Sequence, residues 1–230
     1  NYLYEIGGIM DEIFWTQNFG GDKETFLNSI EDKDARLFAE INYGPWNHFD
    51  NLAPFLPEYG AMPAGAGFYP ADMTKEEFEA WDNPNKTSQY TLITRDENGE
   101  LQAVWFHEAY AEKIQKAADL LLKAADLAGD EEFANYLRLR SKALLTDDYF
   151  ESDMAWMDVR NNNVDFVVGP IENYVDALYG YKAAHEAFIL IKDQAWSKQL
   201  AHYAELLPEL QTQLPVAPEY KAEKPGADAD

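Results

Sequence analysis

Helical spacing of apolar residues is the feature that most restricts how this chain can fold. In the opening stretch Leu3, Ile6, Ile9 and Ile13 recur at three- and four-residue steps, which predicts a helix with one buried face. The same spacing predicts helices over about 22–30, 32–42, 75–81, 108–128, 130–145, 147–158 and 194–213. No part of the chain follows the βαβ order, so we do not expect a doubly wound parallel sheet.

Polar residues at the helix starts support these assignments. A side chain at an N-cap position accepts backbone N–H groups that the first turn leaves unpaired, and acidic residues there complement the helix dipole. These two roles account for the caps Asp22, Asp32, Thr74 and Asp130 and for the doublets Glu31-Asp32, Glu131-Glu132 and Asp147-Asp148.

Two helices contain residues that disfavour a regular helix. Gly7-Gly8 lies inside the opening helix, where each glycine costs roughly 1 kcal/mol relative to alanine, so we expect close packing or a bend at this point. Pro208 lies inside the last helix and predicts a kink there.

Strand signals are confined to two regions. Residues 90–94 and 101–106 flank Asp96-Glu97-Asn98-Gly99, and Asn-Gly favours the positive φ angles of a tight hairpin turn. The β-branched and aromatic run from Val164 to Tyr174 predicts another strand, which Gly169-Pro170 marks as an edge strand or a bulge. A second apolar stretch runs over 183–191. The predicted fold is therefore α+β and predominantly helical, a helical lobe with a small antiparallel or mixed sheet.

Residues 44–84 show no regular period but contain several aromatic side chains. A polar linker would lack these aromatic side chains, so we expect a long ordered loop that packs against the core. Loops of this length in compact domains are often functional.

Charge excludes several classes of partner. The chain has 18 basic and 42 acidic side chains, a formal net charge of −24, which argues against binding nucleic acid or anionic lipid. Hydrophobic residues at 47% argue against a disordered acidic chain. Because there is no cysteine, disulfides, thiolate nucleophiles and zinc–sulfur sites are excluded and the compartment stays undetermined. No apolar run approaches the roughly 20 residues of a membrane span.

Most candidate metal-binding and catalytic motifs lack a residue at one of the positions that the motif requires. His107-Glu108 could begin a metal-binding His-Glu-x-x-His helix, but Ala111 stands where the second histidine is needed. No histidine pairs with a nucleophile and an acid, and Asp96-Glu97-Asn98-Gly99 fits a hairpin turn better than a calcium loop. We therefore expect neither catalytic residues nor a metal site in this chain.

One segment, 164–186, admits two interpretations. An apolar strand interrupted by Gly169-Pro170 presents Glu172, Asn173 and Tyr174 at its end, and a bulge can redirect such side chains toward a cleft. An exposed edge there could accept a peptide by strand addition, with Glu172 holding an ammonium group. Alternatively, this is a barrel-corner strand with a solvated acid.

The same segment resembles a known family. The runs Gly169-Pro170-Ile171-Glu172-Asn173-Tyr174-Val175-Asp176 and Gly180-Tyr181-Lys182-Ala183-Ala184-His185-Glu186-Ala187-Phe188 are similar to a signature stretch of the dipeptidyl peptidase III metallopeptidases. The runs 42–46 (Asn-Tyr-Gly-Pro-Trp) and 63–73 resemble bacterial relatives described as zinc-dependent hydrolases. The likeness extends over essentially all of the chain and corresponds to the N-terminal portion of such an enzyme.

The resemblance implies a two-lobed zinc aminopeptidase that removes dipeptides from oligopeptide N-termini in a wide cleft. It assigns Glu172 and Tyr174 to contacts with the peptide and Glu186 to its free amine, while Asn173 between the first two could add a hydrogen bond. The chain departs from the family pattern by one extra residue between Asp176 and Gly180.

The family's zinc motif, a His-Glu pair with a second histidine on one helix and a later glutamate, is absent from this sequence. A metallopeptidase needs that site to activate water. We therefore expect zinc in the parent enzyme but no cofactor and no hydrolysis in this chain alone, whose ends at Asn1 and Asp230 fit a fragment.

The expected organisation has three parts. Residues 1–190 would form a mixed helical lobe that walls the substrate cleft, residues 191–214 a helix leading toward the missing C-terminal zinc-bearing lobe, and residues 215–230 an extended tail. The expected function is to provide peptide-binding contacts in a dipeptidyl peptidase III-like hydrolase. The alternative is a non-catalytic acidic binding or scaffolding domain.

Overall fold

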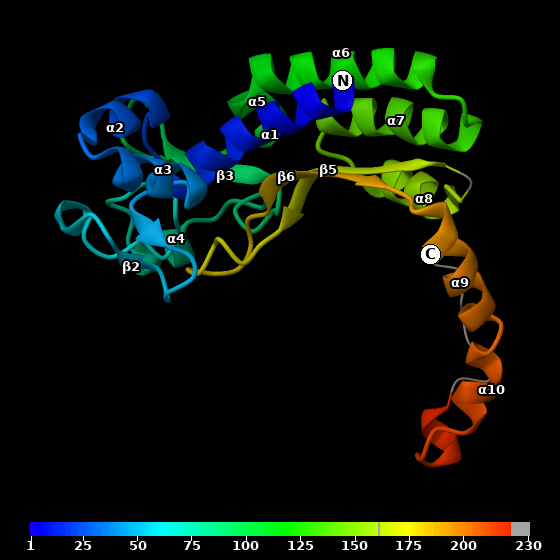
Figure 1. Cartoon of the computed structure of the whole chain (residues 1–230). Coiled ribbons are helices and arrows are strands. Elements are labelled where there is room, and N and C mark those ends of the chain that lie inside the picture. The colour runs from blue at the N-terminus through cyan, green and yellow to red at the C-terminus, as the bar shows by residue number, and fades with distance from the viewer. Residues whose placement is uncertain (161, 222–230) are drawn as a thin grey trace.

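Helices form most of the regular structure in the computed structural model, which describes residues 1–160 and 162–221 (Figure 1). The α-helices are α1 (Tyr2–Phe19), α2 (Lys23–Ser29), α3 (Lys33–Ile41), α4 (Lys75–Ala80), α5 (Phe106–Ala109), α6 (Ala111–Leu127), α7 (Glu131–Leu144), α8 (Phe150–Asp158), α9 (Gln194–Ala204) and α10 (Leu207–Thr212). The 3-10 helices are η1 (Pro57–Tyr59) and η2 (Pro218–Tyr220). The strands are β1 (Trp46–Asn47), β2 (Ala53–Pro54), β3 (Thr91–Arg95), β4 (Leu101–Trp105), β5 (Val164–Glu172) and β6 (Ala184–Ile191).

The core lies between a layer of helices and the β5–β6 ribbon. Helix α1 packs on both α6 and β6, α6 packs on α7, and α7 packs on α8. In Figure 1 the blue α1 lies beside the green α6 and α7, above the two strands. Ile6 and Ile13 from α1, Leu121 from α6, Leu137 from α7 and Phe166 from β5 are fully buried in this layer. The predicted helix-rich α+β class is confirmed.

The strands pair in antiparallel, two-stranded ladders within the described ranges: β1 with β2, β3 with β4, and β5 with β6. The predicted 90–106 hairpin is confirmed, with Gly99 at a φ of 82° and Asp96 Oδ1 accepting the N–H groups of Asn98 and Glu100. The stretch over 183–191 supplies β6. Along β5, Phe166 and Val168 are buried, whereas Val164 is only partly buried.

Most predicted helix caps are present. The side chains of Asp22, Asp32, Thr74 and Asp130 accept the N–H of the residue three positions later. The Asp147-Asp148 doublet is different, because Tyr149 is the N-cap of α8 and makes no side-chain cap. Asp147 instead has a φ of 54° and accepts hydrogen bonds from the backbone and ring of His107.

The two predicted helix irregularities have different outcomes. Neither Gly7 nor Gly8 is packed closely, since a Cβ on either would meet no atom within 4 Å, so of the two expected features, close packing or a bend, close packing is absent. The last helix ends at Ala204 and restarts at Leu207, so Pro208 lies in the first turn of α10. Proline suits that position because its missing N–H would be unpaired there in any case.

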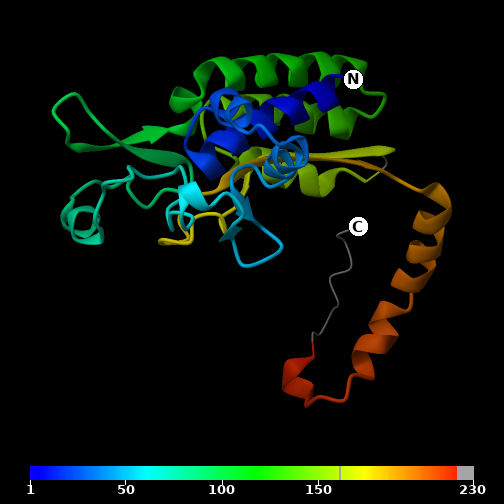
Figure 2. The same ribbon diagram turned by 60° about the vertical axis from the view of Figure 1, so that its left-hand side comes forward.

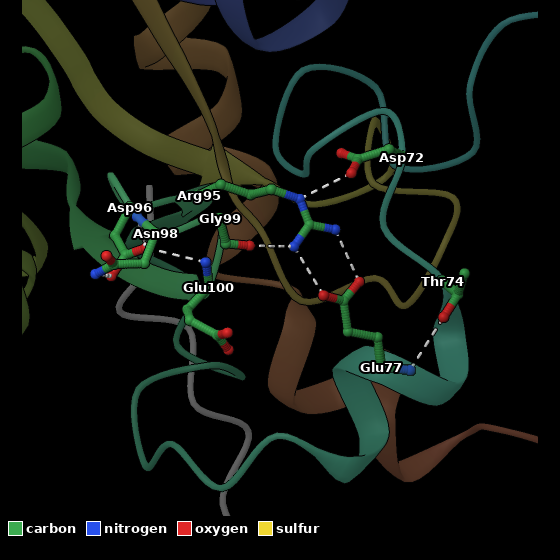
Figure 3. A network of polar contacts seen from close by, with 8 residues as sticks. All are labelled: Asp72, Thr74, Glu77, Arg95, Asp96, Asn98, Gly99 and Glu100. Carbon is green, nitrogen blue, oxygen red and sulfur yellow. Dashed lines mark hydrogen bonds and ion pairs between the residues drawn. The ribbon is translucent and has the colours of Figure 1, made fainter.

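The loop over 44–84 is ordered and tied to the hairpin through Arg95. Figure 3 shows the Arg95 guanidinium between two acidic side chains, with Nη1 and Nη2 bonded to the Glu77 carboxylate at 2.7 and 2.9 Å and Nε bonded to Asp72 at 2.9 Å. Nη1 also donates to the Gly99 carbonyl at 2.8 Å. Helix α4, which carries Glu77, is thereby held against the tip of the β3–β4 hairpin.

Helices α9 and α10 form an arm that projects from the end of β6. Figures 1 and 2 show this orange and red segment extending away from the body of the molecule. Neither helix contains a buried residue, and the exposed apolar side chains along them are Trp196, Leu200, Tyr203, Leu206, Leu207 and Leu210. Among the helices of the described ranges, none has the length and apolarity required to cross a bilayer.

Candidate functional site

The end of β5 is shaped by a bulge and a compact loop. The register between β5 and β6 shifts between Pro170 and Glu172, one residue beyond the predicted Gly169-Pro170 position. Past Glu172, residues 173–183 fold around the buried Asp176 carboxylate. It accepts the Tyr69 hydroxyl at 2.7 Å and four backbone N–H groups, those of Leu178, Tyr179, Tyr181 and Lys182.

Tyr174 and Glu186 meet at a cavity of about 330 Å³ beside this loop. One wall comes from β6 and Tyr174, another from α1, and a third from the end of α3 and the segment that follows it. The residues lining the cavity are Gly7, Asp11, Phe14, Ile41, Tyr43, His48, Phe49, Tyr174, His185, Glu186, Ala187 and Phe188.

Electrostatics show that the predicted acids influence one another. Burial raises the pKa of Glu186, and the negative charge of Glu172 raises it further, while the nearby Tyr174 hydroxyl acts in the opposite direction. Burial also raises the pKa of Tyr174, with additional contributions from Glu186 and Glu172. The three side chains therefore lie within electrostatic reach of one another.

A second tyrosine–acid pair lies on the α1 side of the cavity. The Tyr43 hydroxyl donates to Asp11 Oδ1, and the Tyr43 carbonyl accepts the Asn18 side-chain amide at 2.9 Å. Tyr43 adopts a φ of 52° where α3 has ended. Burial and Asp11 raise its pKa far above the usual value, and the charge of Glu186 and the Tyr174 ring add to this effect. The two pairs therefore face each other across the cavity.

The predicted substrate-contact residues do not all lie in one place. Tyr174 and Glu186 line the cavity, whereas Glu172 and Asn173 are exposed at the β5 end outside its lining. Asn173 Nδ2 donates to the Gly180 carbonyl at 2.6 Å, so this amide closes the loop.

The sequence analysis did not predict that residues of α1 line the cavity. Asp11 shares a helix face with Gly7 and Phe14 at i, i+4 and i+7, which is a signal available in the sequence. Tyr43 lies in the Asn-Tyr-Gly-Pro-Trp run that carries part of the family resemblance.

Zinc ligands do not assemble within the described residues, where no group of three or more histidine and acidic side chains is suitably placed for a metal. His107 Nδ1 lies 2.7 Å from Asp147 Oδ2, and this pair has no third ligand of that kind. The residues of the site above therefore do not fit a zinc centre, and no step involving zinc can be assigned to them.

Comparison with known proteins places the chain in a family. The model of the Peptidase family M49 matches residues 70–226, more than half of the sequence. The chain belongs to peptidase family M49. This M49 chain superimposes on the dipeptidyl peptidase III of Caldithrix abyssi with a TM-score of 0.85 and 38% identity, covering 97% of this chain and 44% of that one. The dipeptidyl peptidase III of Corallococcus sp. strain EGB gives a TM-score of 0.82 and 31% identity with the same coverage.

A curated plant protein is also similar to this M49 chain. Nudix hydrolase 3 of Arabidopsis thaliana is 30% identical, and the alignment covers 96% of this chain and 36% of that protein. The M49 chain thus spans less than half the length of each of these relatives. The resemblance to dipeptidyl peptidase III stated from the sequence is confirmed.

Proposed function

We propose that this chain forms one wall of the peptide cleft of a dipeptidyl peptidase III-like zinc hydrolase. In this role Glu172, Asn173, Tyr174 and Glu186 contact the amino end of an oligopeptide. Zinc and the groups that hold it come from the C-terminal zinc-bearing lobe outside these 230 residues. Membership of family M49 and the 44% coverage of two dipeptidyl peptidase III chains support a partner lobe of this kind.

The observation that carries the proposal is the meeting of Tyr174 and Glu186 at the cavity, with Glu172 within electrostatic reach of both. Mutually repelling carboxylates gain most from a cation between them, and a peptide amine provides one. Charge-assisted hydrogen bonds from its ammonium to carboxylate oxygens are about twice as strong as neutral ones.

Solvent exposure limits what the isolated chain can bind. Glu172 is exposed here, and exposed ion pairs contribute only about 0–1 kcal/mol. Covering the site with a second lobe would lower the solvent screening and strengthen the same contact. The proposal is therefore tested in the complete protein that carries this chain.

Glu172→Gln tests the assignment directly. In the complete protein we expect it to weaken binding of an oligopeptide with a free amine about tenfold, since a charged contact becomes a neutral one. Zinc content, measured by atomic absorption, should be unchanged because Glu172 does not hold the metal. Glu100→Gln is the matched control, an exposed acid at the hairpin tip far from β5 in sequence.

Two results would contradict the proposal. One is an affinity unchanged by Glu172→Gln, Tyr174→Phe and Glu186→Gln alike. The other is zinc-dependent release of dipeptides by the 230-residue chain alone, which would place catalysis in residues assigned here to binding.

A further inference from the structure

The cavity beside Tyr174 has an unbalanced negative charge. Its lining contains two carboxylates, Asp11 and Glu186, and neither lysine nor arginine. The remaining bases in the lining are His48 and His185, and burial lowers the pKa of both, so both rings are neutral near pH 7. A ligand that enters this cavity is therefore favoured if it brings a positive charge.

The two carboxylates have free capacity for a donor. The Tyr43 hydroxyl bonds to Oδ1 of Asp11 and leaves the second oxygen of the carboxylate unbonded in the described chain. Oε2 of Glu186 has no hydrogen-bond partner among the described residues, and because it is shielded from solvent the carboxylate must turn toward the cavity to meet a donor. An ammonium group carries three donors, so it can bond to more than one carboxylate oxygen.

An apolar rim adjoins these acids. Phe14, Ile41, Phe49, Ala187 and Phe188 line the cavity, and Phe49 is 86% exposed although it is one of the largest apolar side chains in the loop. The volume of about 330 Å³ is near the lower end of the roughly 300–1,000 Å³ typical of ligand sites. It suits one residue of a peptide better than a longer stretch.

We propose that this cavity receives the first residue of the bound peptide, with Asp11 of α1 sharing the ammonium with Glu186 and with the Phe49–Phe188 rim selecting an apolar side chain. The inference rests on the proposed function and deepens it. It assigns a binding role to α1 and to the segment after α3, and it names peptides with an apolar first residue as the favoured class. Glu172, outside the lining, would then attract the amine without contacting the first side chain.

Gly7 provides a way to block the cavity without damaging the core. It lines the cavity, and a Cβ built on it meets no atom within 4 Å. Gly7→Leu should therefore fill space in the cavity while improving the helix propensity of α1. Gly8→Leu is the matched control, because Gly8 is equally uncrowded but does not line the cavity.

The experiment is calorimetric titration of the complete protein with hydrolysis-resistant tetrapeptides that begin with phenylalanine or with alanine. We expect the phenylalanine peptide to bind about tenfold more tightly than the alanine peptide. Gly7→Leu and Phe49→Ala should reduce that preference to about twofold or less, whereas Gly8→Leu should retain it. Phe49→Ala should leave folding intact, since this side chain is 86% exposed.

Asp11→Asn removes the negative charge but should preserve the fold, because the amide oxygen can still accept a hydrogen bond from the Tyr43 hydroxyl. We expect it to weaken both tetrapeptides about tenfold and to have little effect on their N-acetylated forms, which lack the ammonium. The control is Glu12→Gln on the same helix, an acid that lies 3.3 Å from Lys113 and does not line the cavity.

The outcomes distinguish the two proposals. If Glu172→Gln weakens binding but Asp11→Asn and Gly7→Leu do not, the peptide's first residue lies elsewhere and this inference is overturned while the proposed function stands. If no variant on either wall alters binding, both are overturned.

Discussion

At the scale of single residues, His185 shows how the site is supported from within. It lies on β6 beside Glu186 and is completely buried, with Gln17 donating to its Nδ1 at 3.0 Å and accepting its backbone N–H at 2.8 Å. The rings of Phe106 and Tyr110 enclose the imidazole. Burial lowers its pKa to about 3. The neutral ring is thus a structural link between α1 and β6, two of the three walls of the cavity.

His185 should make the fold sensitive to acid. Its folded pKa is below the unfolded value of about 6.5, so the unfolded chain binds more protons between pH 3 and 6.5 and stability falls as the pH is lowered through that range. The slope from this residue approaches about 1.4 kcal/mol per pH unit.

Urea titrations at several pH values measure this effect as the difference between variants. His185→Gln should show a smaller loss of stability below pH 6.5 than the unchanged chain, whatever its stability at neutral pH. His202→Gln, which removes an exposed histidine, should follow the unchanged chain. Parallel curves for His185→Gln and the unchanged chain would show that the ring does not titrate on unfolding.

At the scale of elements, the loop over 173–183 positions the proposed binding residues at the end of β5. Its shape depends on Asp176, whose carboxylate satisfies four backbone N–H groups and the Tyr69 hydroxyl. Lys182 follows, with Nζ bonded to the carbonyls of Lys86 and Ser88 and to Thr91 Oγ1 at 2.8–2.9 Å. The loop is therefore fixed at its centre and at its end.

Asp176→Ala should destabilise the chain by about 3 kcal/mol, because a buried donor left without a partner costs about 1–3 kcal/mol and several would be affected. Asp176→Asn should cost less, since its amide oxygen can still accept hydrogen bonds. Urea denaturation measures both. A loss below about 0.5 kcal/mol for Asp176→Ala would mean that water replaces the carboxylate without penalty.

The sequence predicts correctly those features that depend on contacts between residues close together in the chain. The caps at Asp22, Asp32 and Asp130 and the Asn98-Gly99 turn follow from contacts within a few residues, and their prediction was correct. The cavity depends on α1, the segment after α3 and β6, which are distant in sequence and meet only through tertiary packing. The sequence places Asp11 on one helix face with Gly7 and Phe14 but does not indicate what this face meets, and nothing in it separates Phe49 from an ordinary surface residue.

At the scale of the whole molecule, the α9–α10 arm exposes the apolar stripe expected of a helix with one buried face. Trp196, Leu200 and Tyr203 are 62%, 65% and 61% exposed, although their spacing places them on one side of α9. Apolar surface gathered in this way marks an interaction site. The predicted division into residues 1–190, 191–214 and 215–230 remains a proposal, and residues 222–230 of the tail lie outside the described part of the chain.

Leu200→Glu distinguishes an arm that is covered by the rest of the protein from one that remains in solvent. In the 230-residue chain the substitution should change stability by less than about 0.5 kcal/mol, because the side chain is already exposed. In the complete protein it should cost at least about 2 kcal/mol, since a covering lobe would bury the new charge. Ala201→Glu adds the same charge off the stripe and should be tolerated in both. Equal effects of Leu200→Glu in the two proteins would mean that the proposed zinc-bearing lobe does not cover this side of α9, because a side chain that stays in water has the same effect in both.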